Sequence, residues 1–214
     1  RPYTAFLFGI PYFGYIISRR KYKVLLVTLI VGSAVLVPLF LYNTFLNGHP
    51  FVFGYQFYDP TDRPGFYVHG YTPGMVPGKA LLFISEFCIF FPAIILVPLY
   101  LFQREFYERK ETILLFSIFM SVFIGYLLYF DTGGDRFGPR FLYETLSCIT
   151  PLCAGSLNSL QRYQMRGKRF MPTVPLLLLI LLTIVNVGSF IDRSVYFSDY
   201  IGERKKLFDI IEQN

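Results

Sequence analysis

The sequence predicts an all-α integral membrane protein with about six transmembrane helices and a structured outer loop. Hydrophobic residues make up 54% of the 214 residues and charged residues only 16%, a composition too apolar for a soluble domain. Several apolar runs approach the roughly 20 residues that a helix needs to cross a bilayer. Most Lys and Arg residues lie in short clusters between these runs, so the net charge of +6 does not indicate nucleic-acid binding.

Six apolar runs are expected to be the membrane-spanning helices. They are residues 3–17, 24–42, 80–102, 112–130, 141–160 and 171–190. The first is short for a span, and we expect it to be one arm of a broken helix pair. Residues 1–190 therefore form a polytopic transmembrane domain. Residues 191–214 form a charged tail in which Leu207, Phe208 and Ile211 line one side of a short interfacial helix.

The distribution of Lys and Arg between alternate loops predicts the orientation. The loops after the first, third and fifth runs carry 4, 3 and 4 basic residues, whereas the long loop 43–79 and the ten-residue segment 131–140 carry 2 each. The positive-inside rule then places the long loop, the segment 131–140 and the tail outside the cytoplasm. We expect a multi-pass protein of the plasma (inner) membrane whose two chemically interesting loops share the non-cytoplasmic face.

The segment 131–140, called the decad below, has the sequence Asp-Thr-Gly-Gly-Asp-Arg-Phe-Gly-Pro-Arg. Pro139 suits the first turn of a helix, so the next helix is expected to begin here with its positive end facing the decad. Free N–H groups, three glycines and the guanidinium groups of Arg136 and Arg140 together form a cradle for a phosphate group. The alternative is a tight loop in which Asp131 and Asp135 pair with the two arginines.

Two carboxylates lie within predicted spans, Glu86 in the third and Glu144 in the fifth. A charge in the bilayer is costly, so such a residue faces the protein interior, pairs with a partner or serves function. Glu144 follows Arg140 by four residues, and on a continuous helix the pair shares a side, so that Glu144 orients the guanidinium. A direct acid-base role is the weaker alternative. The sequence contains no Gly-rich nucleotide loop, serine nucleophile elbow or Cys-His dyad.

The long loop is rich in aromatic residues and in both signs of charge around residues 55–66. The candidates for contact with a sugar are Tyr58, Asp59, Asp62 and Arg63. The same stretch contains Asp-Pro and Pro-Gly, which also form ordinary turns. His49 and His69 have no ligand-like spacing, so no metal and no other cofactor is expected, although Asp131 and Asp135 are able to bind a metal weakly.

Three segments resemble the C-terminal half of polytopic glycosyltransferases of the C superfamily, a group that includes protein O-mannosyltransferases and aminoarabinose transferases. They are Arg1-Pro-Tyr-Thr-Ala, Tyr58-Asp-Pro-Thr-Asp-Arg-Pro-Gly-Phe66 and Gly138-Pro-Arg-Phe-Leu-Tyr-Glu144. The resemblance implies transfer of a sugar from a polyprenyl-phosphate carrier to an acceptor on the non-cytoplasmic side. In that family the catalytic acidic residue comes from the first outer loop, which has no counterpart here. We expect it from an N-terminal half or a partner subunit, and we name no catalytic residue.

The resulting hypothesis gives each candidate residue a role. Arg140 and Arg136, with Arg1 on the same face, are expected to hold the carrier phosphate. Glu144 and Glu86 are expected to orient those groups, and the four candidates of the long loop to face the sugar or the acceptor. The partners are the polyprenyl-phosphate-linked sugar and the lipid bilayer. The alternative is a non-enzymatic transporter or flippase-like protein for the same glycolipid, or an assembly subunit.

Overall fold

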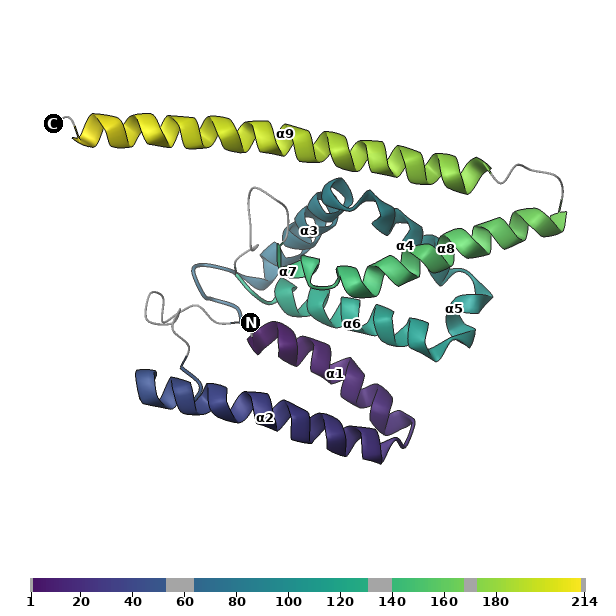
Figure 1. The fold of residues 1–214 in the computed structure, drawn as a ribbon, viewed down its shortest axis with the longest axis horizontal. Helices are drawn as coiled ribbons and strands as arrows, with labels where there is room; N and C mark the ends of the chain where they lie inside the picture. Colours follow the sequence, from purple (N-terminus) through teal and green to yellow (C-terminus); the bar gives the residue numbers. More distant parts are fainter. Residues whose placement is uncertain (1, 53–63, 131–139, 168–172, 213–214) are drawn as a thin grey trace. The chain divides into compact units, whose positions relative to one another are not determined.

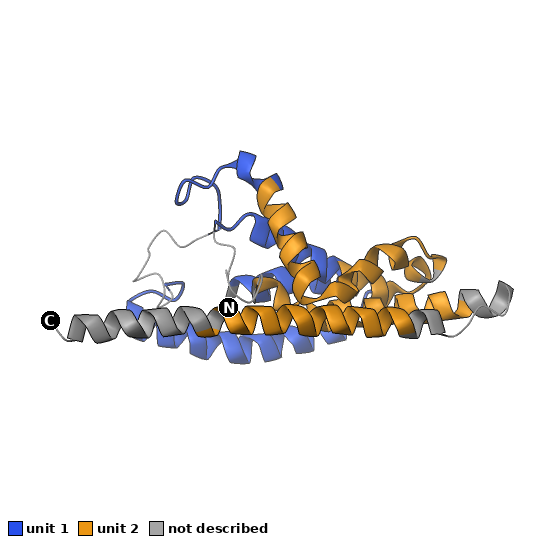
Figure 2. Ribbon diagram, turned by 90° about the horizontal axis from the view of Figure 1, so that it is seen from above, with its two compact units in different colours: residues 1–77, 117–131 blue, residues 78–116, 132–214 orange. Residues whose placement is uncertain are grey.

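The chain is all-helical in the part that the computed structural model describes, which is residues 2–52, 64–130, 140–167 and 173–212. The α-helices, labelled in Figure 1, are α1 (Pro2–Ser18), α2 (Tyr22–Asn47), α3 (Val76–Phe90), α4 (Leu96–Leu101), α5 (Arg104–Glu108), α6 (Lys110–Leu127), α7 (Arg140–Tyr143), α8 (Leu146–Gly167) and α9 (Thr173–Glu212). Two short 3-10 helices, η2 (Pro73–Met75) and η3 (Pro92–Ile95), precede α3 and α4. The predicted helical class is confirmed for these residues. The chain divides into two compact units, residues 1–77 with 117–131 and residues 78–116 with 132–214 (Figure 2).

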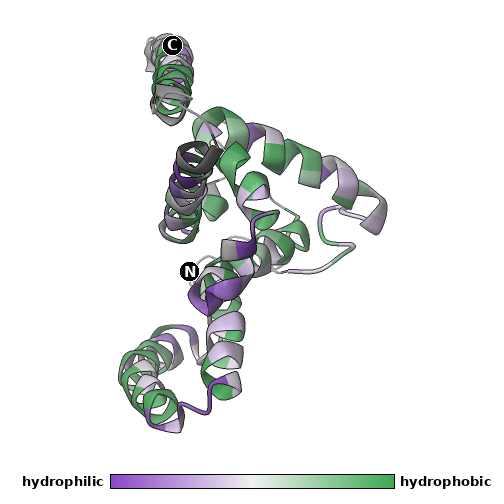
Figure 3. Cartoon of the chain, turned by 90° about the vertical axis from the view of Figure 1, so that its right-hand side faces the viewer, coloured by the Kyte–Doolittle hydropathy of each residue, from purple (hydrophilic) through white to green (hydrophobic). Residues whose placement is uncertain are grey.

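Four helices are long and apolar enough to cross a membrane. They span Tyr22–Asn47, Pro73–Phe90, Lys110–Leu127 and Leu177–Tyr196. Hydrophobic residues predominate along these helices (Figure 3). In α2 most of them are exposed, and the one buried residue of that helix is Asn43. A helix that is apolar all round needs lipid or protein around it. The chain is therefore a multi-pass membrane protein by the length and composition of its helices.

In the first unit, α1 packs closely along the second half of α6. The Ser121 hydroxyl donates a hydrogen bond of 2.7 Å to the Leu7 carbonyl, and the side chain of Leu7 lies directly on Gly125. A side chain at position 125 would overlap Leu7, so the glycine is what permits the close approach of the two helices. The same small-residue principle governs helix packing in membranes.

In the second unit, the predicted continuous span over residues 80–102 is wrong. α3 ends at Phe90, and the chain continues as η3 and α4 after a break at Phe91, whose φ and ψ are −139° and 70°. Pro92 causes this break, because it has no N–H for a helical hydrogen bond and disfavours helical geometry in the preceding residue. Asn186 of α9 donates its amide to the Phe90 carbonyl at the break, which satisfies a backbone group that lipid cannot.

The helix α8 lies against α4 in the second unit. Its buried residues recur with a helical period: Cys148, Ile149, Leu152, Cys153, Ser156 and Ser159. Gly155 brings the two helices together, since a Cβ at that position would lie 2.8 Å from Cζ of Tyr100. The Cys153 thiol donates to the Ala93 carbonyl over 3.1 Å. These buried free cysteines serve packing, as their position in apolar runs predicts.

The last helix differs from the expected arrangement of a span followed by a separate short helix. α9 runs without interruption from Thr173 to Glu212, through the position at residue 190 where the sequence suggests a boundary. The apolar part that could cross a membrane is Leu177–Tyr196. The charged residues that follow extend the same helix.

Candidate functional site

Most of the predicted site residues lie outside the part of the chain that the structure describes. These are Arg1, Tyr58, Asp59, Asp62, Arg63 and Arg136, together with Asp131 and Asp135 of the decad. For Arg140 only the backbone is described, as the first residue of α7. The decad is therefore characterised by its two flanks, the end of α6 before it and α7 after it, each within its own unit.

The flank before the decad is the C-terminal end of α6, where the last carbonyl groups lack the usual helical partner four residues later. Here they accept hydrogen bonds from two distant segments. The Tyr3 hydroxyl of α1 donates to the Gly125 carbonyl over 2.9 Å, and the Tyr71 hydroxyl donates to the Leu127 carbonyl over 2.5 Å. The backbone N–H of Gly65 donates to the Leu128 carbonyl over 2.7 Å. The start of α1 and the end of the long loop are thus held beside the residues that lead into the decad.

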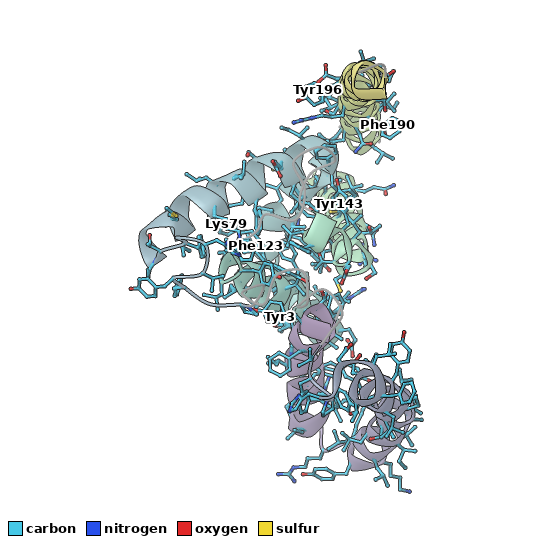
Figure 4. All side chains as sticks on the ribbon, turned by 90° about the vertical axis from the view of Figure 1, so that its left-hand side faces the viewer. Tyr3, Lys79, Phe123, Tyr143, Phe190 and Tyr196 are labelled. Atoms are coloured by element: carbon cyan, nitrogen blue, oxygen red, sulfur yellow. The ribbon has the colours of Figure 1, made fainter. Side chains whose placement is uncertain are left out.

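Aromatic rings gather around this helix end. The Tyr3 ring, labelled in Figure 4, lies edge-on to Tyr126 with centroids 5.5 Å apart and is stacked near Tyr129 at 6.2 Å. Tyr129 stacks on Phe130 at 5.4 Å, and the His69 ring lies 4.4 Å from Phe130. We call these five residues the aromatic cluster. The aromatic residues expected to face a sugar lie in the long loop, and this cluster was not predicted, because its members come from three separate segments.

Two hydroxyl groups of the cluster, those of Tyr3 and Tyr126, also form hydrogen bonds. Thr4 and Tyr126 share a hydrogen bond of 2.5 Å between their oxygens, and Thr4 is buried. Tyr71 is 6% exposed and its ring stacks on Phe66 at 5.8 Å. Hydrogen bonds and ring contacts therefore act together to hold this end of α6.

The flank after the decad begins as the sequence predicts and then departs from the prediction. α7 starts at Arg140, directly after Pro139, but it ends at Tyr143. Thr145 closes a tighter turn, since its N–H and its hydroxyl donate to the Leu142 carbonyl over 2.9 and 2.5 Å. The prediction of one continuous helix that carries Arg140 and Glu144 on the same side is therefore wrong. The Glu144 side chain is exposed. A helix of four residues has a small dipole, so charge at this flank must come from side chains.

The short helix α7 is anchored on α3 beside the carboxylate of Glu86. The Tyr143 ring lies edge-on to the Phe90 ring at 6.4 Å, and Glu86 is near enough to the Tyr143 hydroxyl to interact with it electrostatically. Glu86 is half-buried, and its Oε2 atom is covered by protein. An acidic residue within a candidate span thus faces protein groups, as the cost of exposing it to lipid requires.

Lys79 is a charged residue of the second unit that was counted for the topology but was not predicted as a site residue. It lies near the start of α3, is only 7% exposed, and its Nζ atom is 5.1 Å from the centroid of the Phe83 ring (Figure 4). The spacing of seven residues puts Lys79 and Glu86 on the same face of α3. A lysine at the loop end of an apolar run was the available signal, since a charge in such a place needs protein partners.

Compared with protein-family models, with curated proteins and with solved structures, the chain matches none of them. Within the described residues, no group of three or more His, Cys, Asp and Glu side chains is placed to hold a metal ion. The chemistry of the site is therefore argued from the membrane helices and from the residues on the two flanks of the decad.

Proposed function

We propose that the chain is part of a membrane glycosyltransferase that transfers a sugar from a polyprenyl-phosphate carrier to an acceptor on the non-cytoplasmic face. The observation that carries the proposal is the start of α7 at Arg140, with Tyr143 anchoring that helix on Phe90 beside Glu86. An arginine at the first residue of an anchored helix, next to a glycine-rich segment, suits a phosphate whose lipid tail lies in the bilayer.

The proposed topology has six crossings. Four correspond to the candidate membrane helices, and α1 and α8 supply the other two. The 17 residues of α1 span about 26 Å, slightly less than the hydrocarbon core, which agrees with a short crossing around which the bilayer thins. The alternating numbers of basic residues put the long loop and the decad on the non-cytoplasmic face.

In the proposed reaction, the acceptor attacks the anomeric carbon of the sugar and the bond from that carbon to the phosphate oxygen breaks. The polyprenyl phosphate leaves with the electron pair, and a base takes the acceptor proton. Arg140 and Arg136, with Arg1, stabilise the charge on the leaving phosphate. The loop residues Tyr58, Asp59, Asp62 and Arg63 face the sugar or the acceptor. The base comes from an N-terminal segment or a partner subunit.

The proposal is tested by the donor dependence of transfer in membranes that contain the complete protein. A charge-assisted hydrogen bond contributes about 1.5 to 3 kcal/mol, so Arg140→Gln should weaken donor use by roughly 10- to 150-fold. Arg140→Lys should recover part of this, because it keeps the charge but loses the planar donor pair. Arg104→Gln is the matched control, since Arg104 is exposed and paired with Glu108 at 2.7 Å. Unchanged donor use in Arg140→Gln would overturn the phosphate-site assignment.

A second candidate function is transport of the same glycolipid without bond cleavage. The break at Phe91 favours transport, because discontinuous membrane helices are common in transporters. In this chain a side chain of another helix donates to the carbonyl group at the break. Proteoliposomes containing the complete protein and a labelled polyprenyl-phosphate sugar distinguish the two. Label that crosses the bilayer without transfer supports transport, and label that moves to an acceptor supports the glycosyltransferase.

A further inference from the structure

A cavity of about 480 Å³ opens between α4, the start of α6 and α8, all within the second unit. It is distinct from the two flanks of the decad, because none of its lining residues belongs to them. Its polar lining consists of Tyr100, Arg109, Glu111, Thr112 and Asn158. This volume is in the range of small-molecule sites in proteins.

The cavity has a fixed floor and a charged rim. Tyr100, Thr112 and Leu152 are 4%, 7% and 1% exposed, so the floor belongs to the packed interior. Arg109 and Glu111 are exposed and form part of the rim. The Arg109 carbonyl accepts the N–H of Thr112 over 3.0 Å, which fixes the backbone that carries both charged side chains.

The lining holds one cation and one carboxylate, and this composition selects the kind of ligand. A simple phosphate would be attracted by Arg109 and repelled by Glu111. A zwitterion with a phosphate and an ammonium group satisfies both, and Asn158 and Thr112 add neutral hydrogen-bonding groups. The cavity lies where the candidate span Lys110–Leu127 begins, and Leu115 and Pro151 extend the lining with apolar surface. Such a ligand therefore comes from the membrane itself.

We infer that this cavity binds the phosphoethanolamine head group of a membrane phospholipid, with the phosphate at Arg109 and the ammonium at Glu111. Glu111 also interacts within the protein, but a carboxylate has about four acceptor positions and can bind an ammonium in addition. The acyl chains follow the apolar surface of the neighbouring helices. In the proposed topology the cavity faces the cytoplasmic leaflet, since the loop 103–111 lies on the basic side.

The test measures which lipid co-purifies with the complete protein from bilayer nanodiscs that contain equal amounts of phosphatidylethanolamine, phosphatidylglycerol and phosphatidylcholine. Phosphatidylglycerol lacks the ammonium, and the quaternary ammonium of phosphatidylcholine cannot donate a hydrogen bond. Native mass spectrometry then counts bound lipids by class. The wild-type protein should retain phosphatidylethanolamine over both others, and equal retention of the three classes would overturn the inference without any variant.

Variants assign the preference to the cavity. Arg109→Gln and Glu111→Gln should each lower phosphatidylethanolamine retention by about 2- to 5-fold, the range expected for exposed charge pairs. Glu111→Gln should also abolish the advantage over phosphatidylglycerol. Lys110→Gln is the matched control, because Lys110 carries the same charge at the next position in the chain and does not line the cavity. Equal losses in Lys110→Gln and Arg109→Gln would overturn the assignment.

A bulky side chain placed in the cavity tests whether the ligand occupies it. Ala154 is exposed and lines the cavity, so Ala154→Trp should fill it and lower retention, whereas Gln161→Trp on the same helix and outside the lining should not. Soluble phosphoethanolamine at millimolar concentration distinguishes the source of the head group. The inference expects little competition by it, because the acyl chains contribute to binding. Full displacement of the lipid would overturn the membrane source.

Discussion

The Tyr71 hydroxyl donates a hydrogen bond of 2.5 Å to the carbonyl oxygen of Leu127, although the two residues are 56 positions apart in the sequence. The bond ties the end of the long loop to the last turn of α6. It satisfies a carbonyl that the helix itself leaves without a partner. The hydrogen bond holds the segment that immediately precedes the decad. Loss of this hydrogen bond should therefore lower the stability of the protein and displace that segment.

Replacing Tyr71 by Phe should destabilise the protein by about 1 kcal/mol, because the Leu127 carbonyl loses its donor while the ring stays in place. For a chain of this length we expect the unfolding midpoint in detergent to fall by about 2 to 4 °C. Tyr67→Phe is the control, since the Tyr67 side chain is 80% exposed. An equal change in the two variants would show that the buried hydrogen bond contributes nothing measurable.

The same tyrosine should make stability depend on pH in the alkaline range. Burial raises the pKa of Tyr71 above its ordinary value of 10.0. Because the folded-state pKa is the higher one, the stabilisation is fully present below pH 10 and is lost as the pH rises through the folded-state pKa. Above pH 10 the unfolding midpoint of the wild type should fall more steeply than that of Tyr71→Phe. Parallel curves for the two proteins would contradict the assignment.

The contacts at the end of α6 illustrate what the sequence could not predict. The apolar runs and Pro139 predicted that a helix begins at the end of the decad, where α7 starts at Arg140, because these are local signals. Tyr3, Tyr71 and Tyr129 come from three segments, and no spacing rule brings them to one place. A pair such as Tyr71 and Leu127 depends on tertiary packing, which a single sequence does not encode in a readable pattern.

A second effect on stability is expected for a substitution at Gly125, which lies at the contact between α1 and α6. A Cβ at this position would overlap the Leu7 side chain, whose Cγ atom lies 3.0 Å away. Gly125→Ala should therefore destabilise the protein by about 1 to 3 kcal/mol, despite the better helix propensity of alanine. Gly14→Ala is the control on α1, because a Cβ there meets nothing within 4 Å.

The clash at Gly125 can be separated from other effects of the substitution by a double-mutant cycle. Leu7→Ala removes the overlapping atoms, so the double variant should be more stable than the sum of the two single changes predicts. The measurement is the unfolding midpoint of each variant in the same detergent. Additive losses would mean that Leu7 is not the neighbour that excludes a side chain from this position.

Asn186 of α9 should stabilise the break between α3 and η3. Its amide donates to the Phe90 carbonyl, and hydrogen bonds between membrane helices contribute roughly 0.6 to 2 kcal/mol. Asn186→Leu should lower stability by about this amount. Ser189→Ala is the matched control on the same helix, because the Ser189 hydroxyl bonds only to the Val185 carbonyl of its own helix among the described contacts. Equal unfolding midpoints for the two variants would contradict a capping role for Asn186.

The two helix breaks differ in how visible they are in the sequence. Pro92 is a direct signal for a helix break. One span over residues 80–102 was predicted nevertheless, because the apolar run is long enough to cross the membrane. The interruption after Tyr143 has no such signal, since Glu144 and Thr145 are both tolerated in helices and the turn depends on the buried Thr145 hydroxyl. Lys79 had a signal in its charge, but its burial against Phe83 required the fold.

The last prediction tests the proposed orientation. Cysteines are introduced one at a time at three positions. Thr61→Cys and Thr132→Cys should react with a membrane-impermeant maleimide added to intact cells, because the basic residues put the long loop and the decad outside. Gly167→Cys, at the end of α8, should react only after the membrane is permeabilised. The unmodified protein is the background control, since Cys148 and Cys153 are buried and Cys88 is half-buried. Labelling of Gly167→Cys alone in intact cells would reverse the topology. The phosphate site would then face the cytoplasm, and a glycosyltransferase that uses a carrier on the other side of the membrane would be excluded.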